Sequence, residues 1–518
     1  MVATLVNLFW LMGCFGEPEL KSGSSEKADI ILVSIDTLRA DHLAAYGYER
    51  QTAPFIDSLA KSGTRFAWAR SASPWTLPAH TTMLSGQLPA QHKVVDDTVS
   101  LSKDVPVLPE LLKASGFNTG GFVSTLYVSR VFGFERGFKQ FEDFDLHTEK
   151  RNLAGEVVAE DVVDEALDWW ADQPEGEPAF LFLHFYDVHY AYDPPAPYST
   201  AFDRAPKSGD PRYKNYFHFK KKPLSETQFE HQIAQYDEAL LYVDAQLRRL
   251  QEAADKAGRN VQWVITSDHG EEFGERGSWG HAHTLYAEQL HIPLIFSGGN
   301  IPTAVVESAW ASNHDIAPTI AGLAGVKGLF SDGLDLMQYT DKALPERQLL
   351  GETTRFKTNR LSLTEGEYRL EWDLKKNKVE LFRPLEDPKE LVDLSKSQPE
   401  ALEIMKQHAE EALGETWAVS ANGWIELDGA VMLMDDRKTK KANVKAGDRF
   451  VVLPYDSAIN FGQSGQKILG PFQTIGGSAP ASEAPIERLV SELANEVELD
   501  EKTRQMLETL GYMQKEDE

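Results

Sequence analysis

The chain has 518 residues, of which 42% are hydrophobic, a formal net charge of −28 and a pI of about 4.9. This length accommodates a large core and more than one domain. The acidic balance argues against nucleic acid and anionic membrane surfaces as partners, because both repel a negatively charged protein.

The first residues have the pattern of an export signal. Val2 to Gly13 is an apolar run that is too short to span a bilayer, and it ends at Cys14, the single cysteine of the chain. The ending Leu-Met-Gly-Cys resembles the lipobox of bacterial lipoproteins, although no Lys or Arg precedes Lys21. We predict that residues 1–27 are a lipoprotein signal and tether, that the protein lies in the cell envelope, and that it meets the membrane only through a lipidated Cys14. The alternative is a frayed apolar N-terminus.

Apolar runs that end on polar side chains recur from residue 29 onward. Residues 29–36, 179–185 and 261–266 have the pattern of buried parallel strands, and helical patterns lie between them. The alternation, which continues to about residue 350, predicts a doubly wound α/β domain that binds ligands beyond the carboxyl ends of its strands. The polar side chains at the ends of these runs are Asp36, His184, Asp187, His189, Asp268 and His269.

The stretch from Ser73 to Gly86 predicts a turn followed by a helix. Pro78 favours the first helical turn, and Gly86 ends the helix. Thr76 is then expected at a helix N-terminus, where free N–H groups and the helix dipole favour an oxyanion. Taken alone, this pattern is usually a helix cap.

The pattern changes after residue 350. We predict a catalytic domain over 28–350, a smaller α+β subdomain over 351–424, a β-rich segment of unknown role over 425–484 and a terminal helix over 485–518. The predicted fold class is therefore α/β, with a doubly wound central sheet flanked by helices and a smaller C-terminal α+β subdomain.

Carboxylates and neutral imidazoles together suit a divalent cation. The candidate ligands at three strand ends are Asp36, Asp268, His269, His184, Asp187 and His189, and the hydroxyl of Thr76 lies on a fourth turn. A cation in contact with this hydroxyl would acidify it into a nucleophile.

Several segments resemble the sulfatases of the alkaline phosphatase superfamily. Residues 35–48 are similar to the first metal-ligand segment of that family, and residues 76–86 to its nucleophile motif Cys/Ser-x-Pro-Ser/Ala-Arg. Residues 185–195, 266–271 and 281–294 match the later anion-binding and metal-binding motifs. The resemblance implies an alkaline-phosphatase-like fold and a metal-dependent hydrolase of sulfate or phosphate esters.

The chain departs from the sulfatase pattern in ways that affect the reaction. Thr76 replaces the Cys or Ser that becomes formylglycine, and His80 replaces an Arg. No Lys directly follows residues 116–119, where many sulfatases have one. Thr37 replaces the second Asp of the usual metal-binding pair. A formylglycine hydrate expels sulfate by collapsing to an aldehyde, whereas a threonine ester must be opened by water.

The resulting hypothesis assigns the nucleophile to Thr76. Asp36, Asp268 and His269 would hold a divalent cation that also binds the Thr76 oxygen. His80, His189 and His281 would stabilise the equatorial oxygens or protonate the leaving group. The implied cation is calcium if the protein acts like a sulfatase, and zinc or manganese if it acts like a phosphoesterase. A second cation held by His281 with His189 or Asp187 would give a two-metal phosphoesterase.

Other functions remain open at this point. The substrate is expected to be a small molecule or a glycan ester, and sulfur and phosphorus are both possible reacting centres. One alternative is a sulfatase that uses unmodified Thr, and another is an envelope transferase of phospho-alcohol groups. The third is an inactive module that binds a sulfated or phosphorylated glycan.

Overall fold

A computed structural model describes residues 27–146, 157–203, 224–327, 333–374, 376 and 378–413, together with short strands between 415 and 496. Residues 1–26, which include the predicted lipidation site, lie outside the described residues. No helix within the described part of the chain is long and apolar enough to cross a membrane.

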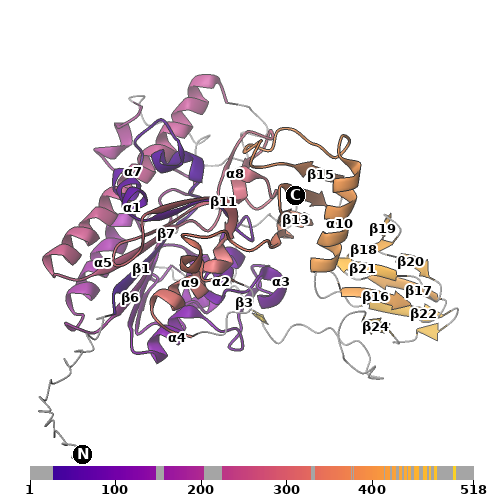
Figure 1. Cartoon of the computed structure of the whole chain (residues 1–518), viewed down its shortest axis with the longest axis horizontal. Coiled ribbons are helices and arrows are strands. Elements are labelled where there is room, and N and C mark those ends of the chain that lie inside the picture. The colour runs from indigo at the N-terminus through magenta and orange to yellow at the C-terminus, as the bar shows by residue number, and fades with distance from the viewer. Residues whose placement is uncertain are drawn as a thin grey trace, which may run out of the picture.

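An eight-stranded sheet forms the centre of the molecule (Figure 1), with the strand order β11-β2-β10-β7-β1-β6-β4-β5. These strands are β1 Asp29–Ile35, β2 Thr64–Arg70, β4 Asn118–Val123, β5 Gln140–Glu142, β6 Ala179–Phe185, β7 Val261–Thr266, β10 His291–Ser297 and β11 Ala304–Ser312. β1, β4, β5, β6 and β7 form a parallel block, whereas β10 runs antiparallel to both of its neighbours. The predicted doubly wound α/β fold is confirmed, and the sheet is mixed.

Helices cover both faces of this sheet. Alternate residues of β1 enter two separate cores: Ile31 and Val33 pack with α1, α5 and α7, while Ile30 and Leu32 pack on the side of α2, α4 and α9. This period-2 alternation explains why the strand is apolar throughout. The helices are α1 Pro54–Ser62, α2 Thr76–Ser85, α3 Pro89–His92, α4 Leu108–Ala114, α5 Ala159–Ala171, α7 Glu226–Lys256, α8 Ala287–Leu290 and α9 Ile316–Leu323.

The C-terminal part begins with a second, antiparallel sheet. β12 Leu349–Thr353, β13 Arg360–Glu365, β14 Tyr368–Asp373 and β15 Lys378–Phe382 pair in that order, and α10 Pro399–Leu413 packs on them. The smaller α+β subdomain predicted from about residue 351 is therefore present, next to the central sheet in Figure 1.

The predicted boundary between residues 424 and 425 is wrong. It falls inside β17 Gly423–Leu427, which pairs with β20 Lys441–Val444 and β22 Ile459–Gln463. The preceding strand β16 Glu415–Val419 pairs with β21 Arg449–Leu453 and β24 Phe472–Thr474. Both β16 and β17 belong with the β-rich segment, because the strands that satisfy their backbone hydrogen bonds all lie in that segment. The other strands of this segment are β18 Val431–Met434, β19 Arg437–Thr439 and β23 Gln466–Lys467.

The predicted terminal helix is also wrong where it can be compared. Ala494–Glu496 form strand β25, which pairs antiparallel with β3 Val99–Leu101. Within the described residues β3 has no other strand partner, so β25 satisfies backbone groups that a helix would leave unpaired. The remaining residues of 485–518 lie outside the described part of the chain.

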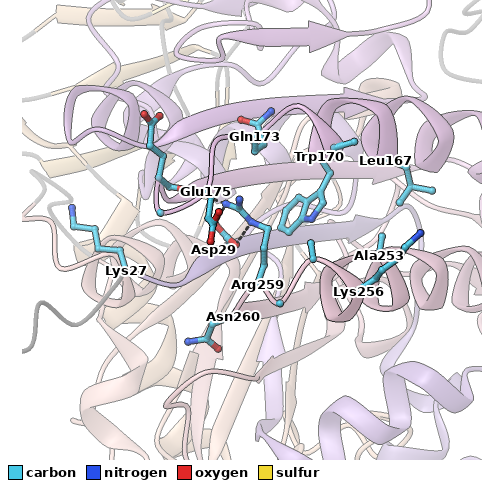
Figure 2. A pocket seen from close by; sticks show the side chains of 15 residues that line it. Lys27, Asp29, Leu167, Trp170, Gln173, Glu175, Ala253, Lys256, Arg259 and Asn260 are labelled. Carbon is cyan, nitrogen blue, oxygen red and sulfur yellow. Dashed lines mark hydrogen bonds and ion pairs between the residues drawn. The ribbon is translucent and has the colours of Figure 1, made fainter.

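A cavity of about 670 Å³ opens at the amino-terminal end of the central strands (Figure 2). Arg259 forms an ion pair with Asp29 at 2.7 Å and lies 5.3 Å from the centre of the Trp170 ring. Asp29 also accepts a hydrogen bond from the backbone of Ala179, so these contacts tie strands together. Asp29 begins β1 and Asp36 follows its end, so this cavity lies at the sheet edge opposite the predicted site.

Candidate active site

Three parallel strands bring potential metal ligands to one edge of the sheet. Asp36 directly follows β1, and Asp268 and His269 follow β7. His184 lies in β6, where it pairs in register with Ser34 of β1. Because parallel strands end at the same edge, these four side chains meet, and all of them are fully buried.

Three of the four carboxylate oxygens of this cluster lack a hydrogen-bond partner. Both oxygens of Asp36 and Oδ2 of Asp268 are buried without one, whereas Oδ1 of Asp268 accepts from His269 N at 2.9 Å. Burial, together with the nearby charge of Asp268, raises the pKa of Asp36 well above its ordinary value. Such groups are costly to bury unless a cation compensates them, so the residues present fit a divalent metal. Asp36, Asp268 and His269 offer ligand atoms that lie within 4.8 Å of one another.

Thr76 lies beside this cluster, at the first position of α2. Its hydroxyl Oγ1 is 3.4 Å from Nε2 of His269. The turn before it is held by Asn313, whose Oδ1 accepts from Ala72 N at 3.0 Å and whose Nδ2 donates to Ala79 O at 3.2 Å. Pro78 carries no N–H, and the remaining free N–H groups of the first turn form the positive end of the helix dipole.

His80 lies one turn further along α2 and points back to the cluster. Nδ1 is 2.9 Å from the carbonyl oxygen of Thr76 and 3.6 Å from Oδ2 of Asp268, and Nε2 is 2.9 Å from the Ser34 hydroxyl. Burial lowers the pKa of this imidazole to about 3, so the ring is neutral at neutral pH. Both ring nitrogens of His80 contact other protein groups. A contact between His80 and the substrate stays a prediction.

His189 and His281 lie beside His269. The ring centres of His281 and His269 are 4.4 Å apart, and those of His281 and His189 are 5.0 Å apart. Nδ1 of His281 lies 2.9 Å from Oε1 of Glu271, whose pKa burial raises to about 7. The imidazoles of His269, His281 and His189 therefore lie in a row, with the carboxyl group of Glu271 next to His281. His269 is the member of this row that lies next to the Thr76 hydroxyl.

Two residues weighed in the sequence contribute no side chain to the cluster, although the backbone N–H of Thr37 donates to Oδ1 of Asp268 at 3.3 Å. Asp187 accepts from the backbone N–H of Ala159 at 3.0 Å and thereby caps the start of α5. Thr37 donates its hydroxyl to the carbonyl oxygen of Val188 at 2.8 Å. The segment after β1 consequently supplies a single carboxylate to the cluster, as expected from the Thr at this position.

Sequence reasoning did not assign roles to three residues that the structure brings in. His184 was noted as a strand-end residue, and its signal is a histidine inside an otherwise wholly apolar strand. Glu271 was noted only as part of a motif, next to the predicted ligands. Asn313 carries no local signal, because its contacts are with residues more than 230 positions away.

Fold and site together define an α/β protein with a buried cluster of potential metal ligands at the carboxyl ends of parallel strands. Residues 28–326 match the model of the sulfatase family. The chain belongs to the sulfatase family, which confirms the predicted class of enzyme, a sulfuric or phosphoric ester hydrolase.

Known proteins with different activities resemble the chain. It is 27% identical over 277 residues to the low-salt glycan biosynthesis sulfotransferase Agl7 of Haloferax volcanii. The aligned region covers 52% of this chain and 57% of that protein. A protein whose structure was solved in complex with its substrate D-glucosamine-2-N,6-O-disulfate has a TM-score of 0.61 at 18% identity, and the match covers 74% of this chain and 97% of the other. The phosphonate monoester hydrolase of Agrobacterium radiobacter has a TM-score of 0.59 at 17% identity, with coverages of 74% and 94%. These structural likenesses support the fold.

Proposed function

We propose that this protein hydrolyses sulfate or phosphate esters with Thr76 as the nucleophile, beside a divalent cation held by Asp36, Asp268 and His269. The observation that carries the proposal is the position of the Thr76 hydroxyl. It lies at a helix N-terminus, 3.4 Å from a histidine that belongs to a buried cluster of unpartnered carboxylates.

A bound divalent cation would supply Lewis-acid polarisation and would lower the pKa of a hydroxyl next to it. Thr76 Oγ1 attacks sulfur or phosphorus in line, the bond to the leaving alcohol breaks, and the anion is held as an ester of Thr76. The free N–H groups at the start of α2 stabilise the equatorial oxygens of this group.

His189 and His281 act as the general base and the general acid. His189 and His281 are neutral at neutral pH because burial lowers their pKa values, and a neutral imidazole accepts a proton from Thr76 or from the attacking water. The same proton is then passed to the departing alkoxide. Water completes the cycle by attacking the threonine ester, since Thr has a single oxygen and cannot expel the anion by collapse.

The choice between sulfur and phosphorus stays a prediction, as does the identity of the metal. A glycan ester is a reasonable substrate class, because the structural neighbour described above was solved with a sulfated glucosamine. Export, lipidation of Cys14 and a place in the cell envelope are expectations that concern residues outside the described part of the chain.

The test compares the wild type with Thr76→Ala and Thr76→Ser on aryl sulfate, phosphate monoester, phosphodiester and phosphonate ester substrates. We expect Thr76→Ala to lower kcat by about 10³-fold or more on the preferred substrate and Thr76→Ser to retain part of the activity. The substrate on which the wild type shows the highest kcat/KM identifies the reacting centre.

Two further readouts separate the proposed reaction from its alternatives. Adding an alcohol acceptor and measuring its esterified product detects a transferase, the activity named for the Haloferax relative. Wild-type turnover by Thr76→Ala on every active substrate would rule out Thr76 as the nucleophile. Absence of any turnover with bound metal would favour an anion-binding module.

A further inference from the structure

His184 is a buried histidine whose ring nitrogens have no hydrogen-bond partner. Its side chain is fully buried in β6, and both Nδ1 and Nε2 lack a partner. A buried polar group left in this way costs about 1–3 kcal/mol. Nε2 lies 3.5 Å from Oδ2 of Asp36, and the ring centre lies 5.0 Å from that of His80. The unpartnered imidazole therefore lies against the carboxylate cluster.

His80 can offer a second nitrogen to the same space. Its Nδ1 lies 3.6 Å from Oδ2 of Asp268, and the Ser34 hydroxyl can accept a hydrogen bond from Nε2–H. In that tautomer Nδ1 carries a lone pair, and its 2.9 Å contact with the carbonyl oxygen of Thr76 must lengthen as it turns to a cation, because that oxygen cannot donate. The carbonyl oxygen of Thr76, which Nδ1 also approaches, still lies in the i to i+4 ladder of α2.

The separations between these atoms fit coordination rather than hydrogen bonding. Two ligand atoms that each lie about 2.1 Å from one tetrahedral cation are about 3.4 Å apart. In the group His80, His184 and Asp268, Nδ1 of His80 lies 3.6 Å from Oδ2 of Asp268, and in the group Asp36, Asp268 and His269, Nε2 of His269 lies 3.3 Å from the same oxygen. Nε2 of His184 lies 3.5 Å from Oδ2 of Asp36, which belongs to the neighbouring group. His80, His184 and Asp268 offer one atom each within 4.8 Å of one another, as do Asp36, Asp268 and His269.

We infer that His80, His184 and Asp268 form a second cation site, next to the one proposed at Asp36, Asp268 and His269. Asp268 bridges the two sites through Oδ2, because its Oδ1 already accepts backbone N–H groups. The inference rests on the proposed function, since Asp268 belongs to both sites. The site differs from the two-cation arrangement considered from the sequence, which used His281 with His189 or Asp187.

The donor set indicates the chemical class of the cation. Two imidazoles and one carboxylate favour Zn²⁺ or a similar transition metal over Ca²⁺, which takes oxygen ligands. Two divalent cations facing two carboxylates leave a net positive charge. Such a centre complements a phosphate monoester dianion better than a singly charged sulfate ester.

The experiment measures the metal content and thermal stability of the full chain. The protein is stripped with EDTA, dialysed against Zn²⁺, desalted and analysed for bound zinc. We expect about two cations per chain in the wild type and about one in His184→Leu and in His80→Gln. His92→Gln is the matched control and should keep about two. His92 is equally buried, but its ring contacts Thr82 at 3.1 Å and Val94 N at 3.0 Å rather than the cluster.

Thermal melts distinguish lost coordination from misfolding. Leucine removes no hydrogen bond at position 184, so metal-free His184→Leu should melt at or above the metal-free wild type, while its gain in melting temperature with Zn²⁺ shrinks. If either variant fails to fold, anomalous scattering at the zinc edge from wild-type crystals decides, with two peaks beside Asp268 expected.

Other outcomes overturn the inference in distinguishable ways. One cation per chain in the wild type, or two in both histidine variants, rejects the second site. In that case, turnover that depends on Thr76 leaves the proposed function in place. A wild type that binds no cation rejects both the second site and the metal-dependent function.

Discussion

At the scale of single residues, the contact between Glu271 and His281 determines how one catalytic candidate is oriented. Nδ1 of His281 donates to Oε1 of Glu271 at 2.9 Å, and Tyr192 donates to Oε2 at 3.4 Å. Fixing one ring nitrogen sets the tautomer and the direction of the other. Glu271 is therefore a positioning residue for His281.

We expect Glu271→Ala to lower kcat by about 10- to 100-fold with a small change in KM, because outer partners of this kind usually have effects of that size. Glu271→Gln should fall between Ala and the wild type, because its amide oxygen can still accept from Nδ1. Steady-state kinetics on the best substrate checks both. His283→Gln is the control: His283 makes a similar contact with Glu272 at 3.0 Å, and an equal loss of kcat there would contradict a specific role for Glu271.

At the scale of secondary-structure elements, Glu390 ties the small antiparallel sheet to the central one. Its carboxylate pairs with Arg70 of β2 at 2.7 Å and with Arg369 of β14 at 2.8 Å, and it accepts from Ala287 N at the start of α8. All three charged side chains are buried. Removing the carboxylate would leave two buried guanidinium groups facing each other.

We predict that Glu390→Ala lowers the free energy of unfolding by about 3–5 kcal/mol, as expected when one partner of a buried charge network is lost. Chemical denaturation followed by fluorescence measures it. Glu386→Ala removes an exposed carboxylate whose distance to Arg383 is 3.6 Å, and it should change stability by less than about 1 kcal/mol. Similar losses of unfolding free energy in Glu390→Ala and Glu386→Ala would show that the buried ion pairs of Glu390 do not stabilise the contact between the two sheets.

The same scale shows what the sequence could and could not predict. β6 was predicted with the bounds that the structure has, because an apolar run is a local signal. β16 and β17 were assigned to the wrong subdomain, since their partners lie further along the chain. At the candidate site, the proximity of Asp36, Asp268 and His269 could be predicted, because Asp36 directly follows one apolar strand and the other two lie within three residues of the end of another. The role of His184 depends on the register between β1 and β6, which no local pattern encodes.

At the scale of the whole molecule, the buried carboxylates couple metal binding to stability. Asp36 and Asp268 lie beyond the ends of adjacent central strands, and within the described residues no Lys or Arg side chain forms a hydrogen bond or an ion pair with either of them. A ligand that binds only the folded state stabilises it by about 4 kcal/mol when its free concentration is about 1,000 times Kd. Chelation should therefore destabilise the entire catalytic domain rather than one loop.

We predict that EDTA lowers the melting temperature of the wild type by several degrees and that adding back Zn²⁺, Mn²⁺ or Ca²⁺ restores it for the preferred ion. Metal-free Asp36→Asn should melt above the metal-free wild type, because one of two facing carboxylates is now neutral, and metal should then add little. Differential scanning calorimetry with and without chelator makes the comparison.

Asp187→Asn is the matched control, because it neutralises a buried carboxyl group at the start of α5, outside the cluster. The Asn side chain keeps an oxygen that can accept from Ala159 N. This variant should retain the full response to metal. Two results would contradict the prediction that metal bound at the cluster stabilises the fold. One is a wild type with the same melting temperature with and without chelator, and the other is an Asp187→Asn control that no longer responds to metal.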